Sequence, residues 1–180
     1  MKNSNSVIDW FKNIPNKPNH TFLSFNIVEF YPSITEDLLT KVISWAKRFA
    51  AIPNEHTSII KHPRNSLLFY GNNTWVKKSD SNSLFDVTRG SYDGSDVCGL
   101  VGPYVLLKLS QEFGKEKVGL YRDNGLMVLN GTRGRQADKA RKTLHNIFQE
   151  FDLKITAEVN NQTVNFLDVT FNLQQDESYS

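Results

Sequence analysis

The sequence has little of what secreted, membrane-spanning or zinc-binding proteins need. Its 180 residues include a single cysteine, Cys98, which excludes an internal disulfide framework and favours a reducing compartment. No apolar run approaches the roughly 20 residues that cross a bilayer, and the N-terminal segment lacks a signal-peptide core. The four histidines show no metal-ligand spacing, so no zinc site is expected. We therefore expect a soluble, intracellular protein without a membrane partner.

The sequence also lacks a strong excess of charge of either sign. Lys and Arg number 21 against 19 Asp and Glu, which gives a formal net charge of +2. This balance permits nucleic-acid binding without requiring it, because domains that neutralise phosphates usually carry a clustered basic patch. Lys77–Lys78 and the span from Arg133 to Lys142 are the candidate clusters. Each cluster could equally be the solvated face of a loop or a helix.

The length and composition predict one compact domain. A chain of this size with 39% hydrophobic residues can bury a single core. Residues 1–20 are expected to be a polar lead-in with one short amphipathic piece, because two prolines interrupt regular structure there. Residues 21–173 are expected to form the domain, and residues 174–180 a tail.

Hydrophobic periodicity predicts an alternation of strands and helices. Ser33-Ile34-Thr35-Glu36 matches a capping box in which Ser33 would cap a helix. The order is typical of an α+β fold with helices on one face of a mainly antiparallel sheet. It suits a split-βαβ core, in which the first strand lies between or beside the arms of a later hairpin. The predicted elements are a strand at 21–28, a helix to about 50, a hairpin at 66–76, a strand at 85–88, a helix at 97–109, a hairpin at 118–129 around Asp123-Asn124-Gly125, a helix at 137–151 and a closing hairpin of strands 153–159 and 164–173.

Two stretches place polar residues where strands end. Phe25–Ile34 reads FNIVEFYPSI and leads from a buried strand into a helix, whereas Tyr121–Asn124 reads YRDN within the 118–129 hairpin. Strand ends are where a rigid element presents functional groups to solvent. Asn-Gly between apolar runs is also the strongest short hairpin pattern, so turn chemistry alone would explain Asp123 and Asn124.

Together with FLDVTF at 166–171, these stretches resemble the palm subdomain of reverse transcriptases, of the type found in Penelope-like and related retroelements. The resemblance covers about residues 21–173. It implies a palm-like α+β fold and templated nucleotidyl transfer. It also implies Mg²⁺ as cofactor, and an RNA or DNA primer–template and a dNTP as partners.

In such enzymes two Mg²⁺ ions roughly 3.5–4 Å apart stabilise the attacking and leaving oxygens, and carboxylates hold the ions. By position, the resemblance implies that Asn26 occupies the first metal-ligand position, Asp123 the second and Asn124 the third. Asparagine therefore stands at two positions where the family has aspartate, and Asp123 is the ligand that matches.

The resemblance implies further roles around this centre. Tyr31 would be the aromatic gate against the ribose 2′-hydroxyl, although it could equally be an aromatic packed at a turn. Lys154 would protonate the departing pyrophosphate, although without the resemblance it is an ordinary strand lysine. The nucleotide-binding set is Tyr31, Phe30, Gly90 and Gly94, and the primer-grip set is Phe166, Leu167 and Asp168.

The departures from the family pattern bear on activity. An asparagine oxygen brings no negative charge, and losing several kcal/mol of transition-state stabilisation would slow the reaction about a thousandfold or more. The fingers and thumb segments of full polymerases are also not expected within these residues, so we expect no activity of the chain as it stands. Two alternatives stay open: a non-catalytic module that binds nucleic acid or protein, and a relic without a molecular role. The sequence does not determine the oligomeric state.

Overall fold

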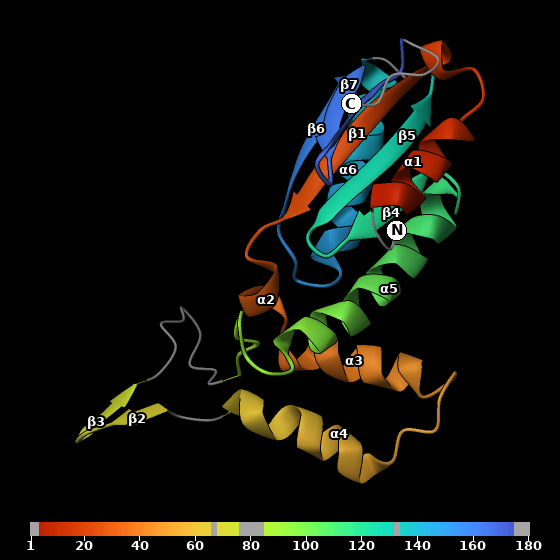
Figure 1. Ribbon diagram of the computed structural model, residues 1–180. Helices are drawn as coiled ribbons and strands as arrows, with labels where there is room; N and C mark the ends of the chain where they lie inside the picture. The colour runs from red at the N-terminus through yellow and green to blue at the C-terminus, as the bar shows by residue number, and fades with distance from the viewer. Residues whose placement is uncertain (1–3, 66–67, 76–84, 132–133, 175–180) are drawn as a thin grey trace. The chain divides into compact units, whose positions relative to one another are not determined.

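The computed structural model describes residues 4–65, 68–75, 85–131 and 134–174 (Figure 1). The chain divides into two compact units, of which unit 1 comprises Met1–Val28 and Val105–Ser180, and unit 2 comprises Glu29–Tyr104. Helix α5 (Gly94–Phe113) contributes residues to both units. Parts of several sequence predictions lie outside the described ranges, namely the Lys77–Lys78 cluster, the Arg133 end of the second basic cluster, residues 66, 67 and 76 of the predicted 66–76 hairpin, and residues 175–180 of the tail.

Unit 1 is built on a four-stranded antiparallel sheet with the order β4-β5-β1-β6. The predicted first strand is confirmed as β1, and it lies beside one arm of the predicted hairpin. Its register against β5 pairs Phe22 with Val128, and Ser24 with Leu126. The strands are β1 (His20–Ile27), β4 (Val118–Tyr121), β5 (Asn124–Asn130) and β6 (Ile155–Asn161).

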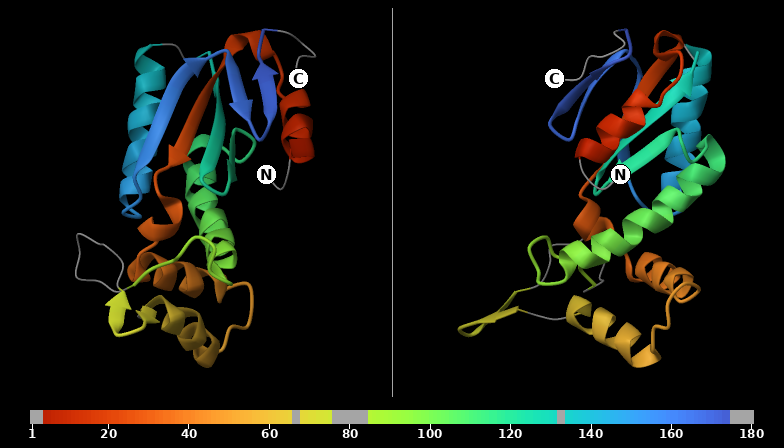
Figure 2. Two further views of the ribbon diagram at one scale, coloured as in Figure 1. Left: turned by 60° about the vertical axis from the view of Figure 1, so that its left-hand side comes forward. Right: turned by 45° about the vertical axis from the view of Figure 1, so that its right-hand side comes forward.

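The two faces of this sheet are covered by different elements (Figure 2). Helix α6 (Arg135–Gln149) packs on one face, where Phe148 meets Phe25 edge-on with 5.4 Å between ring centroids. The other face carries helix α1 (Ser4–Lys12) and the antiparallel hairpin of β7 (Thr163–Phe166) and β8 (Val169–Asn172). The core on this second face includes Val7, Phe11, Phe22, Leu126, Val128, Val164, Phe166 and Phe171.

Helix α1 lies within the segment that the sequence assigns to a polar lead-in. Val7 and Phe11 are four residues apart, so they lie on one face of the helix, and both are buried. The Phe11 ring is 5.0 Å from the Phe171 ring of β8, centroid to centroid. This part of the lead-in therefore contributes to the core.

The closing hairpin predicted from residues 153–159 and 164–173 is wrong. Strand β6 pairs with β1 and not with the segment that follows it. That second segment is broken by Leu167 and Asp168, whose φ angles of 51° and 63° are left-handed, so it folds back on itself as β7 and β8. An apolar alternation of this length fits one strand or a tight hairpin equally well, and the sequence pattern does not distinguish them.

The predicted turn of the 118–129 hairpin is displaced by one residue. Tyr121 pairs with Asn124, so the two-residue loop is Arg122-Asp123, and Arg122 has a left-handed φ of 55°. Gly125 therefore lies in β5 and not in the turn. A Cβ at Gly125 would lie 1.9 Å from Cζ of Phe25, so the glycine is required by the close approach of that ring.

In unit 2 the predicted helix starts and ends elsewhere. Ser33 is not the cap, because Ser33 belongs to the short helix α2 (Phe30–Ser33). Thr35 caps α3 (Glu36–Ala46) instead, with its Oγ1 accepting the backbone N–H of Leu38 at 3.2 Å. Ser33 and Thr35 both lie within the capping-box pattern. Because α2 ends at Ser33, Thr35 is the residue that caps the start of α3.

Unit 2 continues with α4 (Asn54–Lys61), the 3₁₀ turn η2 (His62–Asn65), β2 (Leu68–Tyr70), β3 (Asn73–Trp75) and α5. The pairing of β2 with β3 around Gly71-Asn72 confirms the predicted hairpin. The strand predicted at 85–88 is wrong: these residues belong to no strand, although the backbone N–H of Asp86 donates to the Arg64 carbonyl at 2.9 Å, and Phe85 and Val87 are buried. Within the described ranges, no helix is long and apolar enough to span a membrane.

Candidate functional site

The register of the sheet brings the three predicted metal-ligand positions to one end of it. Asn26 on β1 pairs directly with Asn124 on β5. The next residue of β1, Ile27, donates its backbone N–H to the carbonyl of Asp123 at 2.8 Å. Asn26, Asp123 and Asn124 are therefore neighbours although about a hundred residues separate the two stretches in sequence.

Strand β6 and the segment just before it add two further residues at this end of the sheet. Asn26 also pairs with Thr156, and the backbone N–H of Val28 donates to the carbonyl of Lys154 at 2.8 Å. The Lys154 side chain is exposed. Lys154 precedes β6, and its backbone is held by this hydrogen bond to the segment that follows Asn26.

The donor set at this end carries one formal negative charge. Asp123 is the carboxylate, and its Oδ1 accepts a hydrogen bond from Nδ2 of Asn124 at 3.2 Å. Asn26 and Asn124 offer neutral amide oxygens, whereas two Mg²⁺ ions bring four positive charges and prefer carboxylates. Throughout the part of the chain that the structure describes, no group of three or more His, Cys, Asp or Glu could hold a metal ion. This donor set does not fit a two-magnesium centre.

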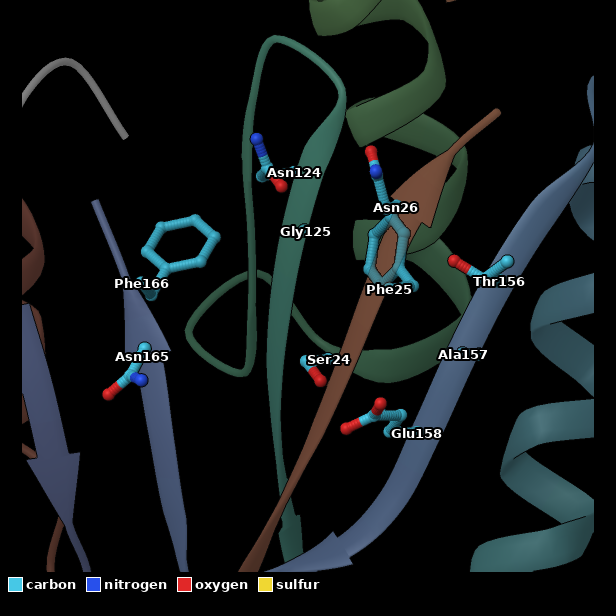
Figure 3. Close-up of a pocket in the computed structure, with 10 residues that line it drawn as sticks. All are labelled: Ser24, Phe25, Asn26, Asn124, Gly125, Thr156, Ala157, Glu158, Asn165 and Phe166. Atoms are coloured by element: carbon cyan, nitrogen blue, oxygen red, sulfur yellow. The ribbon is translucent and has the colours of Figure 1, made fainter. Parts of the chain in front are cut away.

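A cavity of about 270 Å³ opens beside these residues, between the sheet and β7. Figure 3 shows Asn165 and Phe166 of β7 across the cavity from Asn26 and Glu158. Because directly paired residues of an antiparallel sheet point to the same face, the Asn26–Asn124, Asn26–Thr156 and Ser24–Glu158 pairs all line this side. The lining residues are Ser24, Phe25, Asn26, Asn124, Gly125, Thr156, Ala157, Glu158, Asn165 and Phe166.

The predicted primer-grip residues divide between two roles. Phe166 lines the cavity and is 5% exposed. Leu167 and Asp168 form the turn between β7 and β8, and the Leu167 carbonyl accepts a hydrogen bond from Oγ of Ser4 at 3.0 Å. Helix α1 therefore holds this turn in place.

The predicted nucleotide-binding residues belong to unit 2. Phe30 is a core residue with 3% exposure, and the half-buried Tyr31 ring packs edge-on against it at 6.4 Å. Gly90 is exposed with a left-handed φ of 90°. Gly94 is buried at the start of α5, where a Cβ would lie 2.6 Å from the Thr88 carbonyl oxygen. Local structure before α5 therefore explains both glycines: Gly90 adopts a left-handed backbone, and Gly94 lies close to the Thr88 carbonyl.

The described part of the second basic cluster is partly neutralised within α6. Asp138 accepts hydrogen bonds from Arg141 and forms an ion pair with Lys142 at 3.1 Å. The hydrogen bonds from Arg141 and Lys142 lower the pKa of the Asp138 carboxyl below its ordinary value. Arg135 and Lys139 remain as exposed cations on the same helix.

Sequence reasoning missed four polar residues of this cavity: Ser24, Thr156, Glu158 and Asn165. The alternation of exposed and half-buried residues along β6 indicates that Thr156 and Glu158 share a face. Which neighbour that face meets depends on the pairing of β6 with β1, and the pattern of β6 alone does not contain that information.

Comparison with known proteins bears on the fold. No family model matches the sequence, and no curated protein is similar to it. The structure is similar to that of apo telomerase from Candida tropicalis truncated from its C-terminal domain, with a TM-score of 0.57 and 11% sequence identity. The similarity covers 96% of this chain and 39% of that telomerase chain. The antiparallel sheets with their helices, together with this structural similarity, confirm the predicted α+β, palm-like fold class.

Proposed function

We propose that this chain is the palm part of a reverse-transcriptase-type polymerase from a retroelement, and that its present sequence binds nucleic acid without adding nucleotides. The observation that carries the proposal is the register that pairs Asn26 with Asn124 beside the Asp123 turn. These are the positions that the sequence resemblance assigns to the metal ligands. The telomerase-like fold supports the coarser part of the proposal, a nucleic-acid polymerase-like chain.

The chemistry of the donors explains the expected loss of catalysis. Bound Mg²⁺ ions would supply the positive charge that stabilises the attacking and leaving oxygens of nucleotidyl transfer. The residues of this chain at that end of the sheet are one carboxylate and two amides, and the carboxylate of Asp123 already accepts a hydrogen bond from Asn124. A primer–template and a dNTP are the ligands that the resemblance implies, and they would meet a site that holds cations weakly.

The strength of the effect follows from Coulomb's law. Asn26 and Asn124 are exposed, so the dielectric of water applies. At about 4 Å, one carboxylate attracts a divalent cation by about 2 kcal/mol in water, which is about thirtyfold in affinity. Two restored carboxylates should therefore strengthen divalent binding by two to three orders of magnitude if each contacts the ion.

The experiment compares the wild-type chain with the Asn26→Asp/Asn124→Asp variant. Calorimetry with Mg²⁺ and Mn²⁺ measures divalent binding, and primer extension on an RNA template measures activity. The matched control is Asn130→Asp/Asn160→Asp, which adds the same charge at exposed positions near the opposite ends of β5 and β6. We expect tight divalent binding and magnesium-dependent extension from the site variant alone.

Two results would contradict the proposal. If wild-type protein extends primers, then amides at positions 26 and 124 do not prevent catalysis. If the site variant binds divalent ions no more tightly than the control variant does, the three positions do not form a metal site in this fold.

A further inference from the structure

The β2–β3 hairpin of unit 2 (Figure 1) carries three aromatic side chains that are largely exposed. Phe69 is 73% exposed, Tyr70 is 81% exposed and Trp75 is 59% exposed. Within the described ranges the two strands pair only with each other, and an isolated two-stranded hairpin is marginally stable in water. Clustered apolar side chains at a surface mark an interaction site. The hairpin is therefore a candidate for binding a partner.

The register of the hairpin places two of the three rings on one face. Tyr70 pairs with Asn73, and directly paired residues of an antiparallel ladder point to the same side. Trp75 lies two residues after Asn73 on β3, so it shares that side. Phe69 pairs with Thr74 and points to the opposite face. Tyr70 and Trp75 are therefore diagonal neighbours, and the Cβ atoms of such neighbours lie about 7 Å apart in a regular sheet.

Both rings of this face are accessible to a planar ligand. Neither side chain forms a hydrogen bond or a ring contact with any residue that the structure describes. Atoms of two stacked rings lie about 3.5 Å apart, so neighbours separated by about 7 Å leave room for a base at each ring. The Tyr70–Trp75 face is thus suited to flat aromatic groups.

The charge of this part of the chain favours an anionic partner. Residues 56–79 contain no Asp or Glu, and they include Lys or Arg at positions 61, 64, 77 and 78. Lys61 and Arg64 form ion pairs with Glu36 and Asp93, whereas positions 77 and 78 lie outside the described residues and are not part of the proposed site. The sequence around the two rings therefore lacks carboxylates that would repel phosphate groups.

We propose that the Tyr70–Trp75 face of this hairpin binds single-stranded nucleic acid by stacking on its unpaired bases. Every base has a flat face, so stacking of this kind tolerates any sequence. In a duplex the neighbouring base pairs cover those faces, so a duplex does not fit. No metal ion takes part. The proposal rests on the proposed function in one respect, namely that nucleic acid is the ligand of this chain.

The test measures the affinity of the chain for a labelled single-stranded oligomer of about ten nucleotides, a common site size for such proteins. Fluorescence anisotropy in the presence of EDTA gives the dissociation constant for thymidine and adenosine oligomers. We expect the two oligomers to bind within about threefold of each other, because stacking does not depend on hydrogen bonds to base edges. The same oligomer annealed to its complement should bind at least about fivefold more weakly.

Intrinsic tryptophan fluorescence locates the contact. Trp75 is exposed, whereas Trp10 and Trp45 are half-buried. Trp10 also donates Nε1 to the Glu116 carbonyl at 2.6 Å. A base stacked on Trp75 should quench its emission in a saturable way, at the oligomer concentrations at which the anisotropy rises. The Trp75→Phe variant should lose this quenching but keep its affinity, because phenylalanine retains an aromatic face.

The discriminating variants are Tyr70→Ala and Trp75→Ala. Each should weaken binding of the oligomer by about fivefold or more, because stacking of one base on one ring contributes at least that factor. The matched control is Phe69→Ala, which removes an exposed ring from the opposite face of the same hairpin. We expect the control to change the affinity by less than about twofold.

Three results would overturn the proposal. The first is an equal loss of affinity in Phe69→Ala and Trp75→Ala, which would show that the hairpin as a whole matters and not its Tyr70–Trp75 face. The second is a duplex that binds as tightly as the single strand. The third is no binding of the oligomer, together with self-association in sedimentation that Trp75→Ala abolishes, since the face would then bind a second copy of the chain.

The two proposals can fail separately. If the Asn26→Asp/Asn124→Asp variant gains no divalent binding but Trp75→Ala still weakens oligomer binding, the polymerase proposal fails and the stacking face stands. If that variant extends primers but the Tyr70 and Trp75 variants bind the oligomer as tightly as wild-type protein does, the stacking face fails and the polymerase proposal stands.

Discussion

The contact between Gly125 and Phe25 gives the sharpest prediction about stability. Phe25 immediately precedes Asn26, and Gly125 immediately follows Asn124, so this contact lies directly beneath the candidate site. A methyl group at position 125 would lie 1.9–2.3 Å from three atoms of the Phe25 ring. Phe25 is 4% exposed and packs on Phe148, so moving its ring away from position 125 would disrupt its packing against α6.

We expect Gly125→Ala to destabilise the chain by about 3 kcal/mol, at the upper end of the cost of overpacking a core. The backbone cannot relieve the clash by separating the strands, because Phe25 and Gly125 are paired in the ladder. This cost is a large fraction of the total stability of a typical domain, about 5–15 kcal/mol.

Urea unfolding followed by circular dichroism measures the effect. The control is Gly99→Ala, at an exposed position in α5 where a Cβ would meet nothing within 4 Å. The control should be neutral or stabilising by up to about 1 kcal/mol, because alanine favours a helix over glycine. If Gly125→Ala changes the free energy of unfolding by less than about 0.5 kcal/mol, as an ordinary surface substitution does, the packing of Phe25 over Gly125 is refuted.

Two further predictions concern ion pairs in the two units. Asp93→Asn should lower the free energy of unfolding by about 3 kcal/mol. The reason is that the Arg64 side chain is 2% exposed and would keep a buried charge without its partner, whereas Asp93 itself is 34% exposed. An unchanged urea midpoint would contradict this prediction. Hydrogen bonds from Arg141 and Lys142 lower the pKa of Asp138. The stability that its carboxylate contributes is therefore present above the ordinary value of 3.8 and is lost as the pH falls through the folded pKa. Carbon-13 NMR titration should therefore place this pKa below 3.8, and Asp138→Asn should remove that part of the acid dependence.

Local patterns in the sequence predicted the elements that carry their own periodicity. The aromatic and β-branched run before Asn26 gives β1, and the apolar stripes of residues 97–109 and 137–151 correspond to α5 and α6. The Gly71-Asn72 turn gives the β2–β3 hairpin. In each case the residues that determine the element lie within the element itself.

Features that depend on distant partners could not be predicted in this way. The 118–129 hairpin turns at Arg122-Asp123 because the Phe25 ring occupies the space above Gly125, and Phe25 is a hundred residues earlier in the chain. Strand β6 pairs with β1 and not with its sequence neighbour. The pattern of each segment is compatible with both arrangements, and only the packing of the whole unit selects one.

The candidate site shows the same division. Asn26, Asp123 and Asn124 were found because two sequence stretches resemble known motifs, and the register then brings them together. Glu158 and Asn165 belong to no motif, and they reach the cavity through the pairing of β6 and the fold-back of β7.

The amides at positions 26 and 124 also explain how this end of the sheet is stable without a cation. Three carboxylates brought together by the same register would repel one another, and each would need a metal ion or a donor to compensate its charge. With Asn124, the neighbouring side chain becomes a donor to Asp123. The register is fixed by backbone hydrogen bonds and by Phe25 over Gly125, and neither depends on charge. The backbone geometry at this end of the sheet is therefore independent of a cation, and the side chains of Asp123 and Asn124 are joined there by a hydrogen bond.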